Sequence, residues 1–327
     1  MLRRSERRVY SQNGEDGILS TLIDTIELVG EYPVPRTFVE FGVQDGVERN
    51  TRLLQEERGF LVVTMDGSHE DRTPSMNLHE RFITAENINY LFRSLDAPRG
   101  SNLGVLSIDL DRNDWYVWRA ILEAGLVRPV VVVVEYNSSL DPSEALVVPY
   151  DSSGQWDGSH FYGASLAALA LLGARHGYGL AGCDSSGVNA FFVDLHWRGL
   201  GPSGPAALAL PEGAAAAFVR AAYVPDEHGQ LPPSTAAEHD RRLSVPVSSG
   251  GRLVALPCPL NHTGDRTVDR SRGAAALRAC AAEFVEAHGL AAGMGCGDAE
   301  CATAVLAAHL QKRRWLAVGP DGTLVER

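Results

Sequence analysis

Five consecutive valines at positions 130 to 134 limit the fold of this chain more than any other stretch of its sequence. A strand that is apolar at every position must be buried on both of its faces. Such strands are typical of the centre of a parallel sheet that carries helices on either side. The run therefore predicts a layered α/β fold.

Segments with strand and helix patterns alternate along the first 125 residues. Apolar residues recur at helical spacing in 15–30, a segment that ends on a glycine, so a helix is predicted there. Shorter helices are predicted at 48–58 and 113–125. The remaining apolar runs predict four strands, at 38–42, 59–67, 81–87 and 104–111. Elements that alternate at this spacing predict a doubly wound α/β sheet.

A long polar stretch follows Asn137 and has the length of a lid or a binding loop. A helix is predicted after it, at 162–177. Two strands are predicted within 178–195, joined by a tight turn from Asp184 to Gly187. A hairpin at the end of a parallel sheet leaves the last strand antiparallel to its neighbours.

The composition changes near residue 198 to glycine, proline and alanine with weaker periodicity. We therefore predict two domains, 1–200 and 201–327. The second is a mixed α/β extension that serves either as a substrate lid or as an oligomer contact. Its predicted elements are three helices and a closing hairpin, at 214–222, 273–288, 299–312 and 315–327.

The chain carries 29 basic and 41 acidic residues, a formal net charge of −12. This charge gives no general attraction to nucleic acid or anionic lipid, so the expected partner is a small molecule. No long apolar stretch follows the basic residues near the N-terminus, which predicts a cytoplasmic protein that does not enter a membrane. The five cysteines are predicted to be scattered reduced thiols, with a metal site at the C-x4-C of Cys296 and Cys301 as the alternative. The sequence leaves open whether the chain forms a homo-oligomer.

The first predicted strand ends with Glu40, Gly42 and Gly46, and the second ends with Asp66. In a doubly wound sheet this arrangement holds a nucleoside: glycines allow close approach, and the acid accepts the ribose hydroxyl protons. The G-x-G-x-x-G pattern that holds a pyrophosphate is absent. Carboxylates near this turn, Asp45 included, suit a cofactor with a cationic centre and an amino group. S-Adenosylmethionine fits that description.

Several segments together resemble an FkbM-related branch of the class I S-adenosylmethionine-dependent methyltransferases, over roughly residues 10 to 195. The resemblance rests on YSQNGEDGIL, FVEFGVQDGVERNTRLL, FITAENIN, LSIDLDRNDWYVWRAI, VVVVEYN, FYGASLAALALLG and SGVNAFFV. It implies a Rossmann-like sheet of seven strands with the last one antiparallel. It also implies that Glu86 and Asn87, after the third strand, lie near the adenine. A helix cap is the alternative role for these two residues.

Acidic and amide side chains follow the fourth and fifth predicted strands. They are Asp109, Asp111, Asn113, Asp114, Glu135 and Asn137. The carboxyl ends of parallel strands meet at one edge of the sheet, where such folds bind their ligands. Clustered carboxylates repel one another unless a cation is present, and Mg²⁺ prefers oxygen ligands. A magnesium site is therefore predicted, with helix capping by Asp109 and Glu135 as the alternative.

The placement of these acids is similar to that in metal-dependent catechol and sugar O-methyltransferases. The resemblance implies that Asp109, Glu135 and Asn137 are metal ligands and that Asp111 is the general base. We expect Asp109 to contact the cofactor as well. Those families have adjacent residues after the fifth strand, whereas Glu135 and Asn137 are two apart. That spacing still places both on one face of a strand.

Two loops leave alternatives open. In the polar loop, Trp156 either stacks on the acceptor or pins the loop, and His160 is either the base of a metal-independent reaction or a solvated side chain. In SQNGEDG, Gln12 and Glu15 either reach over the cofactor or support the first helix, for which Asn13 is the predicted cap.

These patterns predict an S-adenosylmethionine-dependent methyltransferase, in which magnesium lowers the pKa of a hydroxyl group on a sugar-like or other small metabolite. Asp111 then takes the proton, and the oxygen attacks the methyl group. A metal-independent N- or C-methyltransferase is the near alternative. A nucleotide-sugar binding module without catalysis is the alternative from another class. A nicotinamide dehydrogenase is disfavoured by the missing phosphate-loop glycine.

Overall fold

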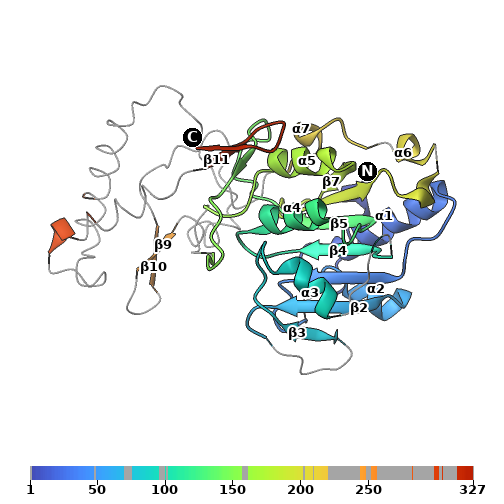
Figure 1. Ribbon diagram of the computed structural model, residues 1–327, viewed down its shortest axis with the longest axis horizontal. Coiled ribbons are helices and arrows are strands. Elements are labelled where there is room, and N and C mark those ends of the chain that lie inside the picture. Colours follow the sequence, from blue (N-terminus) through green and yellow to red (C-terminus); the bar gives the residue numbers. More distant parts are fainter. Residues whose placement is uncertain are drawn as a thin grey trace.

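The structure is a computed structural model (Figure 1). The residues that it describes are 2–47, 49–69, 76–95, 100, 102–156, 161–201, 203–208, 210–219, 244–247, 252–255, 282, 298–301, 304 and 315–326. The predicted base His160 lies outside the described residues. So do the predicted helix at 273–288, apart from residue 282, and most of the one at 299–312.

A seven-stranded sheet forms the centre of the molecule, in the order β3-β2-β1-β4-β5-β8-β7. Its strands are β1 (Thr37–Phe41), β2 (Leu61–Asp66), β3 (Leu78–Glu80), β4 (Val105–Ile108), β5 (Val131–Glu135), β7 (Tyr178–Cys183) and β8 (Asn189–Asp194). Strand β8 is antiparallel to both of its neighbours, whereas β1 to β5 pair in parallel. The prediction of a Rossmann-like doubly wound sheet with an antiparallel last strand is confirmed.

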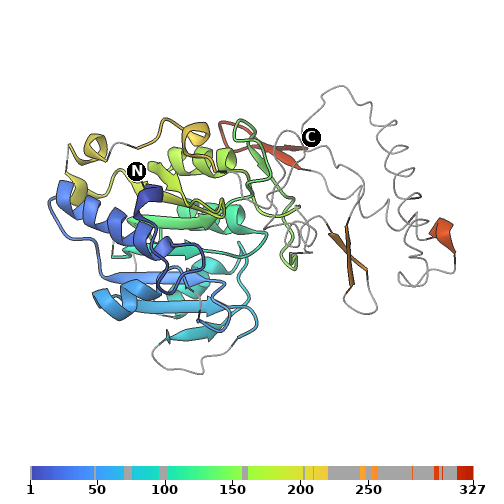
Figure 2. The same ribbon diagram turned by 180° about the vertical axis from the view of Figure 1, so that it is seen from behind.

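Helices cover both faces of this sheet (Figures 1 and 2). One face packs on α1 (Glu15–Val29) and α2 (Arg52–Arg58). The other packs on three helices: α3 (Ile88–Ser94), α4 (Asp114–Ala124) and α5 (Leu166–Arg175). The valine run alternates between these two cores, since Val131 and Val133 face the first and Val132 and Val134 face the second. Burial on both faces explains why the run has no polar position.

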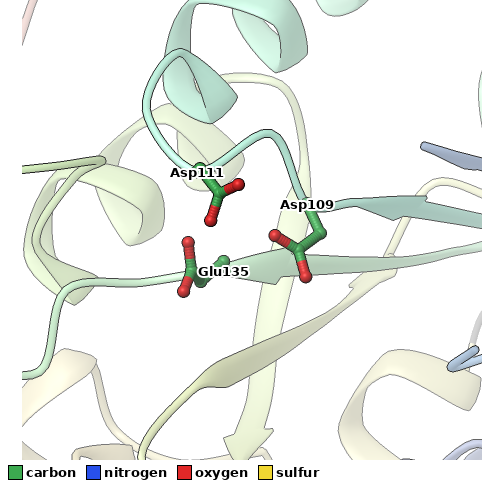
Figure 3. A group of neighbouring side chains, drawn as sticks. All are labelled: Asp109, Asp111 and Glu135. Atoms are coloured by element: carbon green, nitrogen blue, oxygen red, sulfur yellow. The ribbon is translucent and has the colours of Figure 1, made fainter. Parts of the chain in front are cut away.

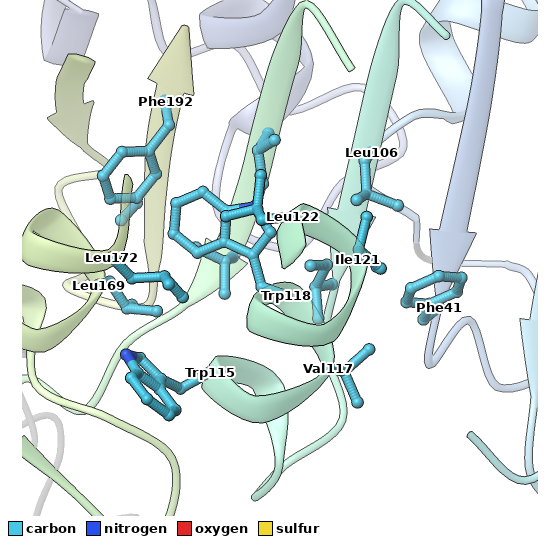
Figure 4. Close-up of a cluster of buried hydrophobic side chains, with 14 of the residues drawn as sticks. Phe41, Leu106, Trp115, Val117, Trp118, Ile121, Leu122, Leu169, Leu172 and Phe192 are labelled. Carbon is cyan, nitrogen blue, oxygen red and sulfur yellow. The ribbon is translucent and has the colours of Figure 1, made fainter. Parts of the chain in front are cut away.

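Large aromatic side chains fill the core under α4 (Figure 4). Trp118 is fully buried, and its ring centroid lies 4.9 Å from that of Phe192 and 6.0 Å from that of Tyr178. Gly173 of α5 faces the same indole, where an added Cβ would lie 3.1 Å from the ring. This close approach fixes α4 and α5 on the sheet, and with them the loops that follow β4 and β5.

The third strand lies earlier than the sequence pattern indicates. The strand is Leu78–Glu80 rather than a strand within 81–87, so that prediction is wrong. Thr84 and Asn87 explain the difference, because each side chain accepts a hydrogen bond from the backbone N–H of the other residue. Such side-chain hydrogen bonds compete with strand pairing, and here they lie immediately before the first residue of α3.

The closing hairpin of the chain is confirmed and packs against the polar loop. Strands β11 (Leu316–Val318) and β12 (Leu324–Glu326) pair antiparallel, and β11 also pairs with β6 (Leu146–Val147). The other described elements are η1 (Leu2–Ser5), η3 (Arg198–Leu200), α6 (Gly204–Ala207), α7 (Ala214–Ala217), β9 (Ser244–Val247) and β10 (Arg252–Ala255). The helix predicted at 214–222 is thus only four residues long in the described part.

The structure also bears on the predictions for the cysteines and for the membrane. Cys301 takes part in a disulfide bond, so the prediction of reduced thiols is wrong for this residue. Cys183, by contrast, is a buried reduced thiol. In the described part of the chain, every helix is too short or too polar to cross a bilayer.

Candidate functional site

A cavity of about 860 Å³ opens at the carboxyl ends of the central strands. Four neighbouring strands contribute to it, with Gly42 after β1, Asp66 at the end of β2, Asp109 after β4 and Glu135 at the end of β5. This is the position in which open α/β sheets bind their ligands. With Asp111, which also lines the cavity, the structure therefore brings five of the predicted site residues around one space.

Gly42 allows the loops after β1 and β4 to touch. Its φ of +71° lies in the left-handed region, and an added Cβ would lie 1.8 Å from the carbonyl oxygen of Asp109. Its N–H donates to the carbonyl of Met65, which joins the turn to the end of β2. Gly46 also has a positive φ, but it packs against the side chain of Met76 and does not line the cavity.

Glu40 supports the first loop and does not line the cavity. Its carboxylate accepts hydrogen bonds from the N–H of Asn50 and the hydroxyl of Thr51. Burial raises the pKa of Glu40, although these hydrogen bonds act in the opposite direction. The side chain points to the segment before α2, so the predicted contact with a cofactor is replaced by a structural one.

Asp66 lines the cavity and is held in a fixed orientation. One carboxylate oxygen accepts from the N–H of Gln44 at 2.8 Å, and the other accepts from the N–H of Ser68 and pairs with Nδ1 of His69, both at 2.9 Å. Burial favours a higher pKa, but these hydrogen bonds outweigh it and lower the pKa of Asp66. The group therefore stays an anion that can accept further hydrogen bonds.

Glu86 and Asn87 lie outside the lining of the cavity. The carboxylate of Glu86 accepts from the hydroxyl of Tyr150, and the amide of Asn87 donates to the carbonyl of Phe82. The residues of this segment that do line the cavity come immediately after β3. They are Arg81, Phe82 and Ile83. The misplaced third strand explains why the sequence pattern indicated positions a few residues too late.

Three carboxylates converge at the middle of the sheet (Figure 3). Asp109 and Asp111 come from the loop after β4, and Glu135 ends β5. One oxygen from each carboxylate lies within 4.8 Å of one from each of the others. Asp111 has a φ of +61°, an uncommon conformation for a residue with a side chain, and it forms part of this turn. Three oxygen ligands at this separation fit a hard divalent cation.

The electrostatics of this cluster disfavour three bare charges. Burial, and then the neighbouring Asp111, raise the pKa of Asp109 well above its usual value. Burial likewise raises the pKa of Asp114 to about 7, although the N–H of Leu110 donates to its carboxylate. Asp114 lies behind the cavity at the start of α4. A cation at the three converging acids would offset their mutual repulsion.

Asn137 does not join the acids, so its prediction as a third ligand is wrong. Its amide donates to the carbonyl of Tyr162, and its side-chain oxygen accepts from the N–H and hydroxyl of Ser139. The side chain is fully buried and does not line the cavity. Two residues share a face only inside a strand, and β5 ends at Glu135.

The N-terminal segment contributes side chains that the sequence analysis largely missed. Arg8, Gln12 and Asn13 all line the cavity. Gly14, not Asn13, is the residue before α1, and the amide of Asn13 donates to Glu15. Glu15 is buried and also accepts from the amide of Asn189. Trp156 of the polar loop lines the cavity too.

The fold and the site define a Rossmann-like α/β protein whose strand ends surround an acidic cavity. Comparison of the chain with protein-family models and with curated proteins found no match. The FkbM-related resemblance therefore stays a prediction.

Charging the buried acids should make the protein less stable as the pH rises. The folded pKa of Asp114, about 7, lies above its ordinary value of 3.8, so its contribution to stability is greatest in acid and is lost as the pH rises through about 7. With EDTA present, we expect the melting temperature to fall by several degrees between about pH 5.5 and pH 8. Asp114→Asn should flatten this fall, measured by differential scanning fluorimetry. An unchanged slope in the variant would contradict the assignment.

Proposed function

We propose that the protein is an S-adenosylmethionine-dependent methyltransferase that uses a divalent cation and acts on a hydroxyl group of a small metabolite. The observation that carries this proposal is the continuity of one cavity from Gly42 and Asp66 to Asp109, Asp111 and Glu135. One end suits a nucleoside with a charged tail, and the other suits oxygen atoms held by a cation. The order of the sheet supports the proposal through the resemblance noted above.

The cofactor end fits the parts of S-adenosylmethionine. Asp66 accepts hydrogen bonds from ribose hydroxyls, and Gly42 lets the ligand approach the backbone after β1. Met65, Phe82 and Ile83 offer apolar surface for the purine. When bound, the cofactor supplies an electrophilic methyl group.

The acceptor end fits a hydroxylated substrate. Magnesium bound there supplies positive charge that favours loss of the hydroxyl proton. Asp109 and Glu135 would hold the ion from two adjacent strands. Asp111 lies close enough to both to act as a third ligand or to take the proton. Trp156 bounds the cavity in the polar loop and helps to exclude water.

Binding of S-adenosylhomocysteine, the product form of the cofactor, tests the proposal. We expect calorimetry to detect binding to the unchanged chain and a roughly tenfold to hundredfold weaker affinity for Asp66→Ala, since hydrogen bonds to a charged group are lost. Asp45→Ala is the matched control, because Asp45 lies in the preceding turn, is exposed and does not line the cavity. Absence of binding to the unchanged chain would overturn the proposal.

A nucleotide-sugar binding module is the second candidate. The observation in its favour is that Arg81 lines the cavity near Asp66 together with His69, where a guanidinium suits a diphosphate. Calorimetry with a uridine diphosphate sugar separates the two candidates. Heat with this ligand and none with S-adenosylhomocysteine favours the binding module.

Three other predictions remain proposals: a small-molecule partner, a cytoplasmic location and a homo-oligomer. The disulfide bond of Cys301 is atypical of a cytoplasmic protein.

A further inference from the structure

The N-terminal segment, residues 5–14, is fixed in place by one buried carboxylate. Oδ2 of Asp16 accepts from the backbone N–H groups of Val9, Tyr10 and Ser11 at 2.7 to 2.9 Å, and from the hydroxyl of Ser11. Asp16 is 1% exposed. Hydrogen bonds to a carboxylate are among the stronger ones in proteins. The segment is therefore held in a defined conformation as part of the fold.

Contacts at the start of the segment hold it against α1 and the sheet. Glu6 accepts from the N–H and hydroxyl of Ser185 in the turn between β7 and β8. A Cβ added at Gly17 of α1 would lie 2.0 Å from the carbonyl oxygen of Ser5, so the segment packs directly against this helix. Figure 2 shows α1 and this segment on one side of the molecule. The segment thus crosses from the first helix to the antiparallel edge of the sheet.

The segment supplies positive charge to one end of an acidic cavity. Among the described residues that line it, the basic side chains are Arg8, His69 and Arg81. Arg81 follows β3, whereas the segment with Arg8 is tied to the turn before β8. The same segment continues to Tyr10, whose ring centroid lies 4.4 Å from the guanidinium of Arg52. Arg52 in turn donates to the carbonyl of Val47 in the loop after β1. Arg8 lies between the contacts made by Glu6 and Tyr10, so it lines the cavity from a segment that passes the loop after β1.

We propose that Arg8, with Gln12 and Asn13, binds a carboxylate, namely that of the amino-acid end of the cofactor. This inference rests on the proposed function. A cofactor whose ribose lies at Asp66 extends its amino-acid end past Gly42 toward the N-terminal segment. A carboxylate there lies close to Asp109 and its acidic neighbours, so it requires a cation. A guanidinium and two side-chain amides provide the donors.

Two ligands that differ only in this end test the inference. S-Adenosylhomocysteine carries the amino-acid group, and 5′-methylthioadenosine has the same nucleoside without it. We expect Arg8→Ala to weaken the first ligand about tenfold to hundredfold and to change the second less than about twofold, measured by calorimetry. Arg8→Lys should recover part of the loss. Arg4→Ala is the control, because Arg4 is exposed and does not line the cavity.

Each other outcome overturns the inference. An equal loss of affinity for both ligands in Arg8→Ala means that Arg8 only supports the fold. An unchanged affinity for S-adenosylhomocysteine means that Arg8 does not bind the cofactor, whatever its role toward an acceptor. Either result leaves the proposed function standing, because both ligands still bind the unchanged chain. If neither ligand binds the unchanged chain, the inference and the proposed function fall together.

Discussion

Gly42→Ala is expected to lower the free energy of unfolding by about 3 to 4 kcal/mol and to abolish binding in the cavity. The new Cβ would lie 1.8 Å from the carbonyl oxygen of Asp109 and 2.9 Å from its carbon. Backbone cannot move aside as a flexible side chain can, so the loops after β1 and β4 have to separate. Asp109 would then leave its position beside Asp111 and Glu135.

Gly59→Ala is the matched control for this prediction. Gly59 ends α2 with a φ of +66°, close to that of Gly42, but an added Cβ there meets no atom within 4 Å. For Gly59→Ala, the expected loss in the free energy of unfolding comes from the left-handed backbone alone and is about 1 kcal/mol. Urea unfolding and binding of S-adenosylhomocysteine measure both variants. Equal destabilisation of the two would mean that the contact between the loops does not matter.

Asp109→Asn is expected to remove stabilisation by magnesium while making the ion-free protein more stable. The unchanged chain should melt at a higher temperature as magnesium is added, since a ligand of the folded state stabilises it. Without the ion, replacing this carboxylate by a neutral amide removes both its burial cost and the repulsion by its acidic neighbours, the two causes that raise the pKa of Asp109. A variant that is more stable in EDTA and insensitive to magnesium cannot be explained by poor folding.

Glu135→Gln should behave in the same way, and Glu86→Gln is the control. Glu86 is an exposed carboxylate outside the cavity, so this variant should keep the full response to magnesium. Asp111→Asn separates the two roles open to Asp111: loss of the response identifies a ligand, and a retained response fits a base. A magnesium response that survives in both Asp109→Asn and Glu135→Gln would overturn the metal site.

Sequence patterns predict the parts of this fold that repeat with a regular period. The valine run of β5 and the apolar positions of α1 identify buried faces, because burial follows the geometry of a strand or a helix. Asp66, Asp109 and Glu135 were predictable for a related reason: parallel strands end at one edge of the sheet, so residues at those ends meet.

The errors lie where the regular period stops. Asn137 is two residues beyond the end of β5, and Thr84 and Asn87 form their own hydrogen bonds, so the alternation of a strand did not apply to them. Arg8 reaches the cavity through contacts between residues as far apart as Glu6 and Ser185. Local sequence carries no signal for such a contact.

The pairing of β11 with β6 joins the polar loop, which carries Trp156 of the cavity lining, to the hairpin formed by β11 and β12. Strand β6 lies in the same loop as Trp156, and its partner Leu316–Val318 comes about 170 positions later. During synthesis on the ribosome, the sheet and its helices can assemble while this loop still lacks its neighbour. The loop that carries Trp156 therefore gains this neighbour only after residues 316–318 have been made, and a product terminated before them would keep the Rossmann-like body without this strand pairing.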